Sequence, residues 1–217
     1  MERKRILIYG DSNTHGFRVS DGLRYRADAR WTGICQELTA EWAEILEEGL
    51  NGRTTCINDP GMEFRNGLSY IEACIRTHLP LDMVCVMLGS NDLKESFRRT
   101  PEDIAKGSAA VLQKARDVAD SKYPGNTCKY VLISPPEVTE EVVSGPFGWD
   151  FEGMETVRKS RMFSALFAKQ AEKHNFLFFD AAAVCRPGKI DGLHLDKENH
   201  QRLGEAFGAW LNEQRLL

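Results

Sequence analysis

Apolar runs of strand length alternate with helical patterns from one end of the chain to the other. The runs that predict strands span residues 5–9, 42–46, 83–88, 130–133 and 176–179. The third run is apolar throughout, which is typical of a central strand covered on both faces. Strands that alternate with helices indicate a parallel sheet between two helix layers. The pattern therefore predicts an α/β fold, built as a single three-layer α/β/α domain over residues 1–217.

Helical patterns fill most of the segments between these runs. Two helices have clear starts, because Thr100 can cap a helix whose first residue is Pro101, and Asp196 can cap the last helix of the chain. Apolar residues at helical spacing mark the buried face of that last helix. They are Leu203, Ala206, Phe207, Trp210 and Leu211. Further helices are expected over residues 30–41, 68–77 and 156–173.

One connection is too long for an ordinary link between a strand and a helix. It spans residues 137–155 and contains Phe147, Trp149 and Phe151. Long connections with exposed aromatic residues often form lids or walls of binding sites. A contact between subunits explains the same aromatic residues equally well. We therefore expect this segment to be a lid or an oligomer contact, and expect a homo-oligomer.

Composition narrows the class of protein. The formal net charge of −4 gives no reason to expect a nucleic acid partner, which needs a concentrated excess of Lys and Arg. The first apolar run is too short for a signal peptide, and no later run approaches the length of a membrane span. We therefore expect a cytoplasmic protein without a membrane partner. The six cysteines form no C-x-x-C pair, which favours free thiols over disulfides or a zinc site.

Candidate chemistry gathers where the predicted strands end. Ser12 follows the first strand, and the loops after the second, third and fifth strands hold Gly52, Asn91 and the segment 191–196. The carboxyl ends of parallel strands share one edge of a sheet, so these residues can meet there. Taken alone, each is also an ordinary turn residue. Their joint occurrence predicts a site.

A serine hydroxyl becomes a useful nucleophile when a base takes its proton as it attacks. His194 is the candidate base, and Asp191 can turn back to orient the imidazole within one loop. The alternative is that both are loop residues close to the helix cap at Asp196. The hypothesis is that Ser12, His194 and Asp191 form a catalytic triad, which needs neither a cofactor nor a metal.

Attack on an ester creates an oxyanion, which needs hydrogen-bond donors fixed in advance. Asn91 offers a side-chain N–H, Gly52 a backbone N–H that no side chain obstructs, and Ser12 its own backbone N–H. Gly61 is a second candidate for the glycine donor. We expect Ser12, Gly52 and Asn91 to form the oxyanion hole.

The sequence around these residues resembles a known superfamily in four ordered blocks. The blocks are residues 10–13 (GDSN), 51–53 (NGR), 89–92 (GSND) and 191–194 (DGLH). Together they are similar to the GDSL/SGNH hydrolases. Residues 10–14, 47–55, 77–82 and 97–101 look like the arylesterase and acyltransferase branch of that superfamily. The resemblance implies a flavodoxin-like fold, the triad and oxyanion hole described above, and hydrolysis of short acyl esters. It also implies acyl transfer to alcohols or peroxide in some relatives, and tight oligomers.

The resemblance has one departure, because Asn13 stands where the name-giving motif has leucine. We expect the substrate pocket to include Asp11 and Asn13 beside the nucleophile. Phe97, Trp149 and Phe151 are candidates for the acyl or alcohol side of the pocket, although they could equally be core or subunit contacts.

Three other functions are compatible with parts of the sequence. Deacetylation of a carbohydrate or another small molecule would use the same site. A phosphatase of the haloacid dehalogenase type would use Asp11 as nucleophile with magnesium. That chemistry requires a second aspartate two residues later as general acid, and Asn13 stands at that position. The third is a noncatalytic flavodoxin-like binding module. The chain lacks both a G-x-G-x-x-G fingerprint and a Walker lysine, so no nucleotide ligand is indicated for such a module.

Overall fold

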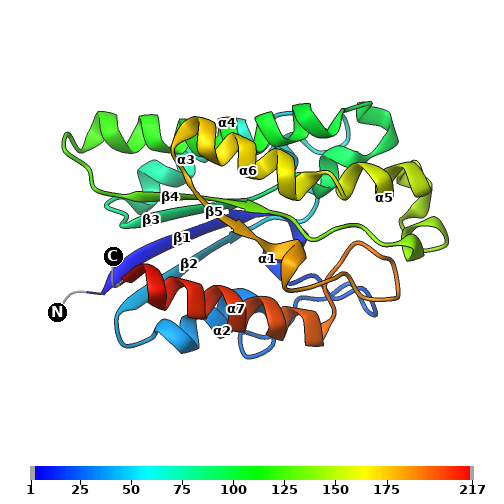
Figure 1. Cartoon of the computed structure of the whole chain (residues 1–217), viewed down its shortest axis with the longest axis horizontal. Coiled ribbons are helices and arrows are strands. Elements are labelled where there is room, and N and C mark those ends of the chain that lie inside the picture. The colour runs from blue at the N-terminus through cyan, green and yellow to red at the C-terminus, as the bar shows by residue number, and fades with distance from the viewer. Residues whose placement is uncertain (1–2, 216–217) are drawn as a thin grey trace.

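Five parallel strands form the central sheet of the protein, in the order β2-β1-β3-β4-β5 (Figure 1). The strands are β1 Lys4–Gly10, β2 Ala43–Gly49, β3 Met83–Met87, β4 Lys129–Ser134 and β5 Leu177–Asp180. The structure is a computed structural model that describes residues 3–215. Residues 1, 2, 216 and 217, which the single-domain prediction includes, lie outside the described residues. The five-stranded parallel sheet is confirmed.

Helices cover both faces of the sheet. Figure 1 shows α2 and α7 on one face and α3, α4 and α6 on the other. The helices are α1 Ser12–His15, α2 Trp31–Thr39, α3 Gly67–His78, α4 Pro101–Lys122, α5 Met154–Ser160, α6 Phe163–His174 and α7 Lys197–Arg215. Short 3₁₀ turns lie at η1 Glu63–Arg65, η2 Ser90–Leu93, η3 Glu95–Phe97, η4 Glu140–Val143, η5 Gly148–Asp150 and η6 Ala181–Ala183. The three-layer α/β/α architecture follows the prediction.

The core forms two layers because side chains alternate along each strand. In β1, Leu7 and Tyr9 belong to the apolar cluster beneath α3, α4 and α6. Ile6 and Ile8 belong to the cluster beneath α2 and α7. All four are at most 1% exposed, and burying an aliphatic side chain such as that of Leu7 or Ile8 stabilises the fold by about 1.5–3 kcal/mol. The sheet is therefore packed on both faces beneath the loops at its edge.

The two predicted helix starts are confirmed. The hydroxyl of Thr100 accepts a hydrogen bond from the backbone N–H of Asp103, at the start of α4. The carboxylate of Asp196 accepts one from the backbone N–H of Asn199, at the start of α7. The buried stripe of α7 includes Leu203, Phe207 and Leu211, as expected.

Two element boundaries differ from the sequence analysis. Strand β2 continues to Gly49 and does not end at residue 46, because Arg30 forms an ion pair with Glu47 at 2.5 Å and lets this acidic segment pair with β1. The helix expected over residues 156–173 is two helices, α5 and α6. Helix α5 packs against η4, whereas α6 packs against α4 and β4, so the two helices contact different elements.

The long connection at 137–155 lies over the carboxyl edge of the sheet. It contains η4 and η5, and Phe151 forms an antiparallel β-bridge with Lys94. Trp149 is 80% exposed. The segment thus forms part of the wall described below, and an oligomer contact there stays a prediction.

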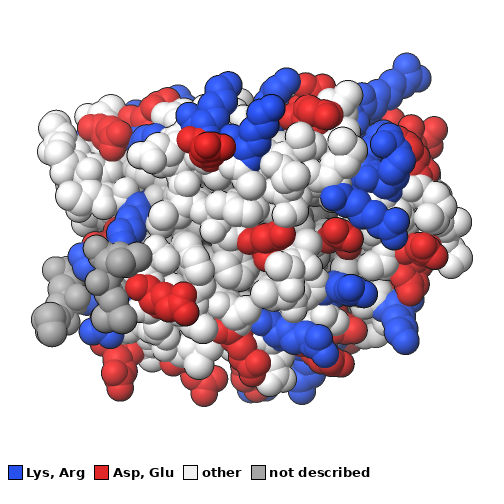
Figure 2. Space-filling model, viewed as in Figure 1, with Lys and Arg blue, Asp and Glu red and all other residues white. Residues whose placement is uncertain are grey.

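The surface carries both signs of charge. On the face drawn in Figure 2, basic and acidic side chains are interspersed around a largely uncharged centre. Within residues 3–215, no helix combines the length and the hydropathy needed to cross a bilayer.

Candidate active site

Segments that follow each of the five strands meet at one cavity. Because Gly10 pairs with both Gly49 and Met87, strands β1, β2 and β3 end level with one another, and their loops begin at the same edge. The cavity has a volume of about 290 Å³. Four of the predicted site residues line it: Ser12, Gly52, Asn91 and His194. Asp191 does not.

A chain of hydrogen bonds runs from Ser12 to Asp191. The Oγ atom of Ser12 lies 2.9 Å from Nε2 of His194, and Nδ1 of His194 lies 2.5 Å from Oδ2 of Asp191. The carboxylate can only accept, so Nδ1 carries the proton and Nε2 is free to accept from the serine hydroxyl. The structure therefore brings together, in the order expected, three residues that are up to 182 positions apart.

Asp191 is built to remain charged. It is 1% exposed, and burial raises its pKa, but the hydrogen bond and the charge of His194 outweigh burial and lower the pKa below its ordinary value. Its second oxygen accepts from the backbone N–H groups of Leu193 and His194, at 2.9 and 3.0 Å. The carboxylate thus closes the turn and fixes the imidazole within the same loop.

Ser12 sits at the first position of the one-turn helix α1, directly after β1. Asp11 caps this helix by accepting from the backbone N–H of Asn13 at 2.9 Å. A side chain at Gly10 would place its Cβ 2.1 Å from the Thr14 hydroxyl and 3.0 Å from the carbonyl oxygen of Met87. Only glycine lets the chain turn this tightly between the strand and the serine.

Gly52 and Asn91 face the same cavity as Ser12. Gly52 has φ of +78°, a conformation that favours glycine, and a Cβ there would lie 2.3 Å from Nε of Arg65. The Asn91 amide donates to the carbonyl oxygen of Arg53 at 3.1 Å, and more weakly to Asp11 at 3.4 Å. Gly61, the second candidate for the glycine donor, is exposed and is not among the lining residues.

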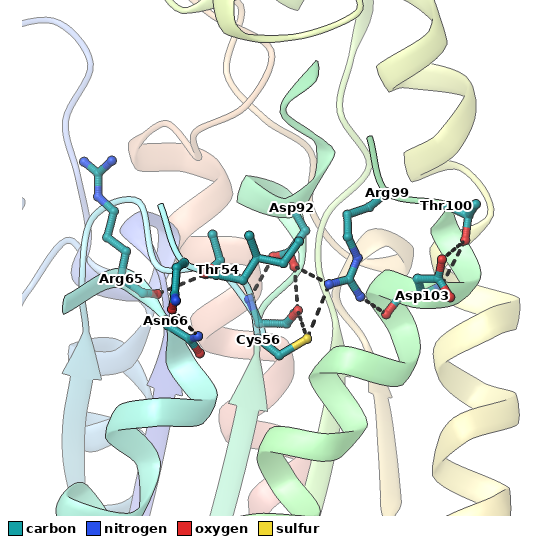
Figure 3. A network of polar contacts seen from close by, with 11 residues as sticks. Thr54, Cys56, Arg65, Asn66, Asp92, Arg99, Thr100 and Asp103 are labelled. Atoms are coloured by element: carbon teal, nitrogen blue, oxygen red, sulfur yellow. Dashed lines mark hydrogen bonds and ion pairs between the residues drawn. The ribbon is translucent and has the colours of Figure 1, made fainter. Parts of the chain in front are cut away.

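A buried acid that the sequence analysis missed ties the loops of Gly52 and Asn91 together. Asp92 is 0% exposed and accepts from the backbone N–H and hydroxyl of Thr55, at 2.8 and 2.5 Å. Burial raises its pKa to about 6, and Thr55 opposes the rise. Arg99 lies 4.0 Å from Asp92, and Figure 3 shows it between Cys56 and Asp103. The sequence feature that could have indicated this role is that Asp92 is a charged residue just after an apolar strand.

The predicted pocket residues divide into two groups. Phe151 and Asn13 line the cavity, although the Asn13 amide is turned toward the backbone of Leu193 and Leu195. Asp11, Phe97 and Trp149 are not among the lining residues. Asp11 is 2% exposed and does not line the cavity, so it is not placed to attack a substrate as a phosphatase nucleophile would.

Two aromatic rings that were not predicted for the pocket pack against the imidazole. The ring centroids of Phe17 and Phe147 lie 4.8 and 5.6 Å from that of His194, and both rings line the cavity. Phe17 lies in a polar loop without periodicity, so no sequence pattern indicated its direction. The two rings and Phe151 make this side of the cavity apolar.

Other parts of the lining are polar and charged. Lys94 forms an ion pair with Asp150 at 2.7 Å, and Arg65 forms one with Asp59 at 2.7 Å. Lys94, Asp150 and Arg65 line the cavity. The cavity thus offers both apolar and hydrogen-bonding groups around the serine.

One cluster in the described part of the chain could hold a metal ion. Single ligand atoms of Glu48, Cys74 and His78 lie within 4.8 Å of one another. Nε2 of His78 lies 2.9 Å from Oε1 of Glu48. None of the three lines the cavity, so an ion bound there would not touch an ester held at Ser12.

Comparisons with known proteins agree with this geometry. The model of the GDSL-like lipase/acylhydrolase family matches residues 8–202. The aryl esterase of M. smegmatis is 38% identical in sequence over 97% of this chain and 99% of that chain, with a TM-score of 0.85. A carbohydrate acetylesterase from Sinorhizobium meliloti is 33% identical over 98% of this chain and 100% of that chain, with a TM-score of 0.88. A search of curated proteins found no match. The chain belongs to the GDSL-like lipase/acylhydrolase family and is a hydrolase of carboxylic esters.

Proposed function

We propose that the protein is a serine esterase that cleaves short-chain acyl esters through an acyl-enzyme. The observation that supports this most strongly is the hydrogen-bonded chain from Ser12 through His194 to Asp191, which opens on the cavity. Ser12 attacks the ester carbonyl while Nε2 of His194 takes the hydroxyl proton. The imidazolium then gives that proton to the leaving alcohol. Water, activated by the same imidazole, attacks the acyl-enzyme and releases the acid.

The oxyanion formed at each attack needs donors that are already in place. We propose that the backbone N–H groups of Ser12 and Gly52 and the side-chain amide of Asn91 serve this role. One hydrogen of that amide is held by the carbonyl oxygen of Arg53, while the contact with Asp11 is long. The weaker contact is the one that an oxyanion would replace.

Replacing Asn91 with alanine is expected to lower kcat by roughly 10²-fold or more, because a donor to the transition state is lost. The measurement is steady-state hydrolysis of p-nitrophenyl acetate. Asn126→Ala is the matched control, because Asn126 bonds Tyr130 and the backbone of Cys128 at the opposite end of the sheet. A kcat for Asn91→Ala as high as that of the control would remove Asn91 from the oxyanion hole.

The small apolar side of the cavity favours a short acyl group. Phe17, Phe147 and Phe151 are part of the lining of a cavity whose whole volume, about 290 Å³, must also admit the alcohol. We expect kcat/KM for p-nitrophenyl esters to fall steeply from acetate and butyrate to octanoate. Equal or rising values along that series would contradict a short-acyl pocket. Adding an alcohol acceptor to the same assay measures how the acyl-enzyme divides between hydrolysis and acyl transfer.

A carbohydrate acetylesterase is the second candidate. The polar lining residues Arg65, Lys94 and Asp150 could hydrogen bond to sugar hydroxyls, and a similar protein from Sinorhizobium meliloti is described as a carbohydrate acetylesterase. An acetylated sugar added to the panel above separates the candidates. A higher kcat/KM for the sugar ester than for p-nitrophenyl acetate, lost in Asp150→Asn, would favour the carbohydrate substrate.

A further inference from the structure

Asn13 directly follows the candidate nucleophile, and its side chain reaches the loop of the candidate base. Its Nδ2 donates to the carbonyl oxygen of Leu193 at 3.1 Å, and its Oδ1 accepts from the backbone N–H of Leu195 at 2.9 Å. These two backbone groups stand immediately before and after His194. Asn13 is 3% exposed, so the amide is shielded from water by the residues it joins.

The partners fix which way the amide points. A carbonyl oxygen can only accept and a backbone N–H can only donate, so Nδ2 must face Leu193 and Oδ1 must face Leu195. A strand residue pairs in the same way with the residues before and after its parallel neighbour. Leucine, which the name-giving motif of the superfamily has at this position, can make neither bond.

The same residue is held firmly on its own side. Its backbone N–H donates to the Asp11 carboxylate at 2.9 Å, and its carbonyl oxygen accepts from Nε1 of Trp31 at 3.0 Å. Asn13 and Ser12 are consecutive residues of α1. A shift of the Asn13 backbone would therefore also move the serine hydroxyl.

The other hydrogen bonds of the His194 loop do not reach the serine, although the Phe17 ring just after α1 also packs on the imidazole. Asp191 lies in that loop and would move with it, while Thr139 bonds Gly192 at 3.0 Å and Gly188 bonds His194 at 2.7 Å, both away from α1. Among the described residues, the hydrogen bonds that join this loop to α1 are the two of the Asn13 amide and the His194 to Ser12 bond itself.

We infer that Asn13 is a positioning residue that sets the distance between the Ser12 hydroxyl and the His194 imidazole by clamping the backbone on both sides of His194. The inference rests on the proposed function of Ser12 and His194. It also changes the role expected for Asn13, from a contact with substrate to a tie between two parts of the catalytic machinery.

The chain contains a matched control for this clamp. The Gln36 amide donates to the carbonyl oxygen of Ala43 at 3.1 Å and accepts from the backbone N–H of Ile45 at 2.8 Å. It thus spans one residue of β2 as Asn13 spans His194. The control clamp lies at the amino end of its strand, whereas the cavity lies at the carboxyl ends.

The test compares Asn13→Leu with Gln36→Leu. Both variants lose a two-bond clamp, and Tm reports how much stability each loses. Asn13→Leu is expected to lower kcat and the rate of labelling by a fluorophosphonate on the order of 10²-fold, because small errors in the placement of catalytic groups are costly. KM should change by less than about threefold, since the amide does not bind substrate. Gln36→Leu should keep kcat within about threefold of the parent.

Asn13→Asp guards against a leucine variant that does not fold. The carboxylate can still accept from Leu195 but places an acceptor against the carbonyl oxygen of Leu193, so kcat should again fall while KM holds. Variants of Asn13 that fold and lose no more kcat than Gln36→Leu would overturn the inference. A Ser12→Ala variant in the same assay distinguishes failure of this inference from failure of the proposed function. If Ser12→Ala kept the activity of the parent, the proposed function itself would be overturned.

Discussion

Ser12→Ala is expected to lower kcat by about 10⁶-fold, the loss typical of removing a serine nucleophile that acts together with its base. The substitution removes only the hydroxyl that lies 2.9 Å from Nε2 of His194. The cap of α1 by Asp11 does not involve that hydroxyl, so the fold should be unchanged. The measurements are kcat with p-nitrophenyl acetate, and Tm to show that the variant is folded.

A control serine makes this result specific. Ser121 donates its hydroxyl to the carbonyl oxygen of Val118 near the end of α4, outside the lining of the cavity. Ser121→Ala should retain the activity of the parent. A folded Ser12→Ala variant that hydrolyses the ester at the parent rate would show that another group attacks.

Asp191→Asn is expected to lower kcat by about 10⁴-fold, because the amide leaves His194 in the wrong tautomer. An amide N–H facing Nδ1 makes that nitrogen an acceptor, so the proton moves to Nε2. The imidazole can then no longer take the proton of Ser12. The amide oxygen can still accept from the backbone of Leu193 and His194, so the turn is retained.

Asp196→Asn provides the comparison for this variant. Asp196 lies in the same segment but caps α7 through the backbone N–H of Asn199, and asparagine caps a helix as well as aspartate does. Its kcat should therefore match the parent. If Asp191→Asn lost no more activity than Asp196→Asn, the carboxylate would not be the partner of the imidazole.

Much of the site could be predicted because its residues stand at strand ends. Ser12, Asn91 and His194 each follow an apolar run or lie in the loop after one, and parallel strands bring such positions to one edge. Runs of apolar residues indicate where each strand ends, and each run can be recognised from a short stretch of sequence. Apolar runs also predicted the five strands, and the capping residues Thr100 and Asp196 predicted the starts of α4 and α7.

Other features depend on contacts that no local pattern records. The direction of the Asn13 amide depends on the backbone of Leu193 and Leu195, which lies 180 or more residues away in the sequence. The packing of Phe17 and Phe147 on the imidazole depends on how two loops fold over the sheet. The added length of β2 depends on the ion pair between Arg30 and Glu47. Each of these was visible only once distant segments were placed together.

The most direct test of the account is to find where a fluorophosphonate attaches. The active enzyme should take up one phosphonyl group per chain, and mass spectrometry of the digested protein should place it on Ser12. His194→Ala should label far more slowly, because nothing then takes the hydroxyl proton. A stoichiometric adduct on another residue, with Ser12 unmodified and activity abolished, would contradict the assignment of the nucleophile and the mechanism that depends on it.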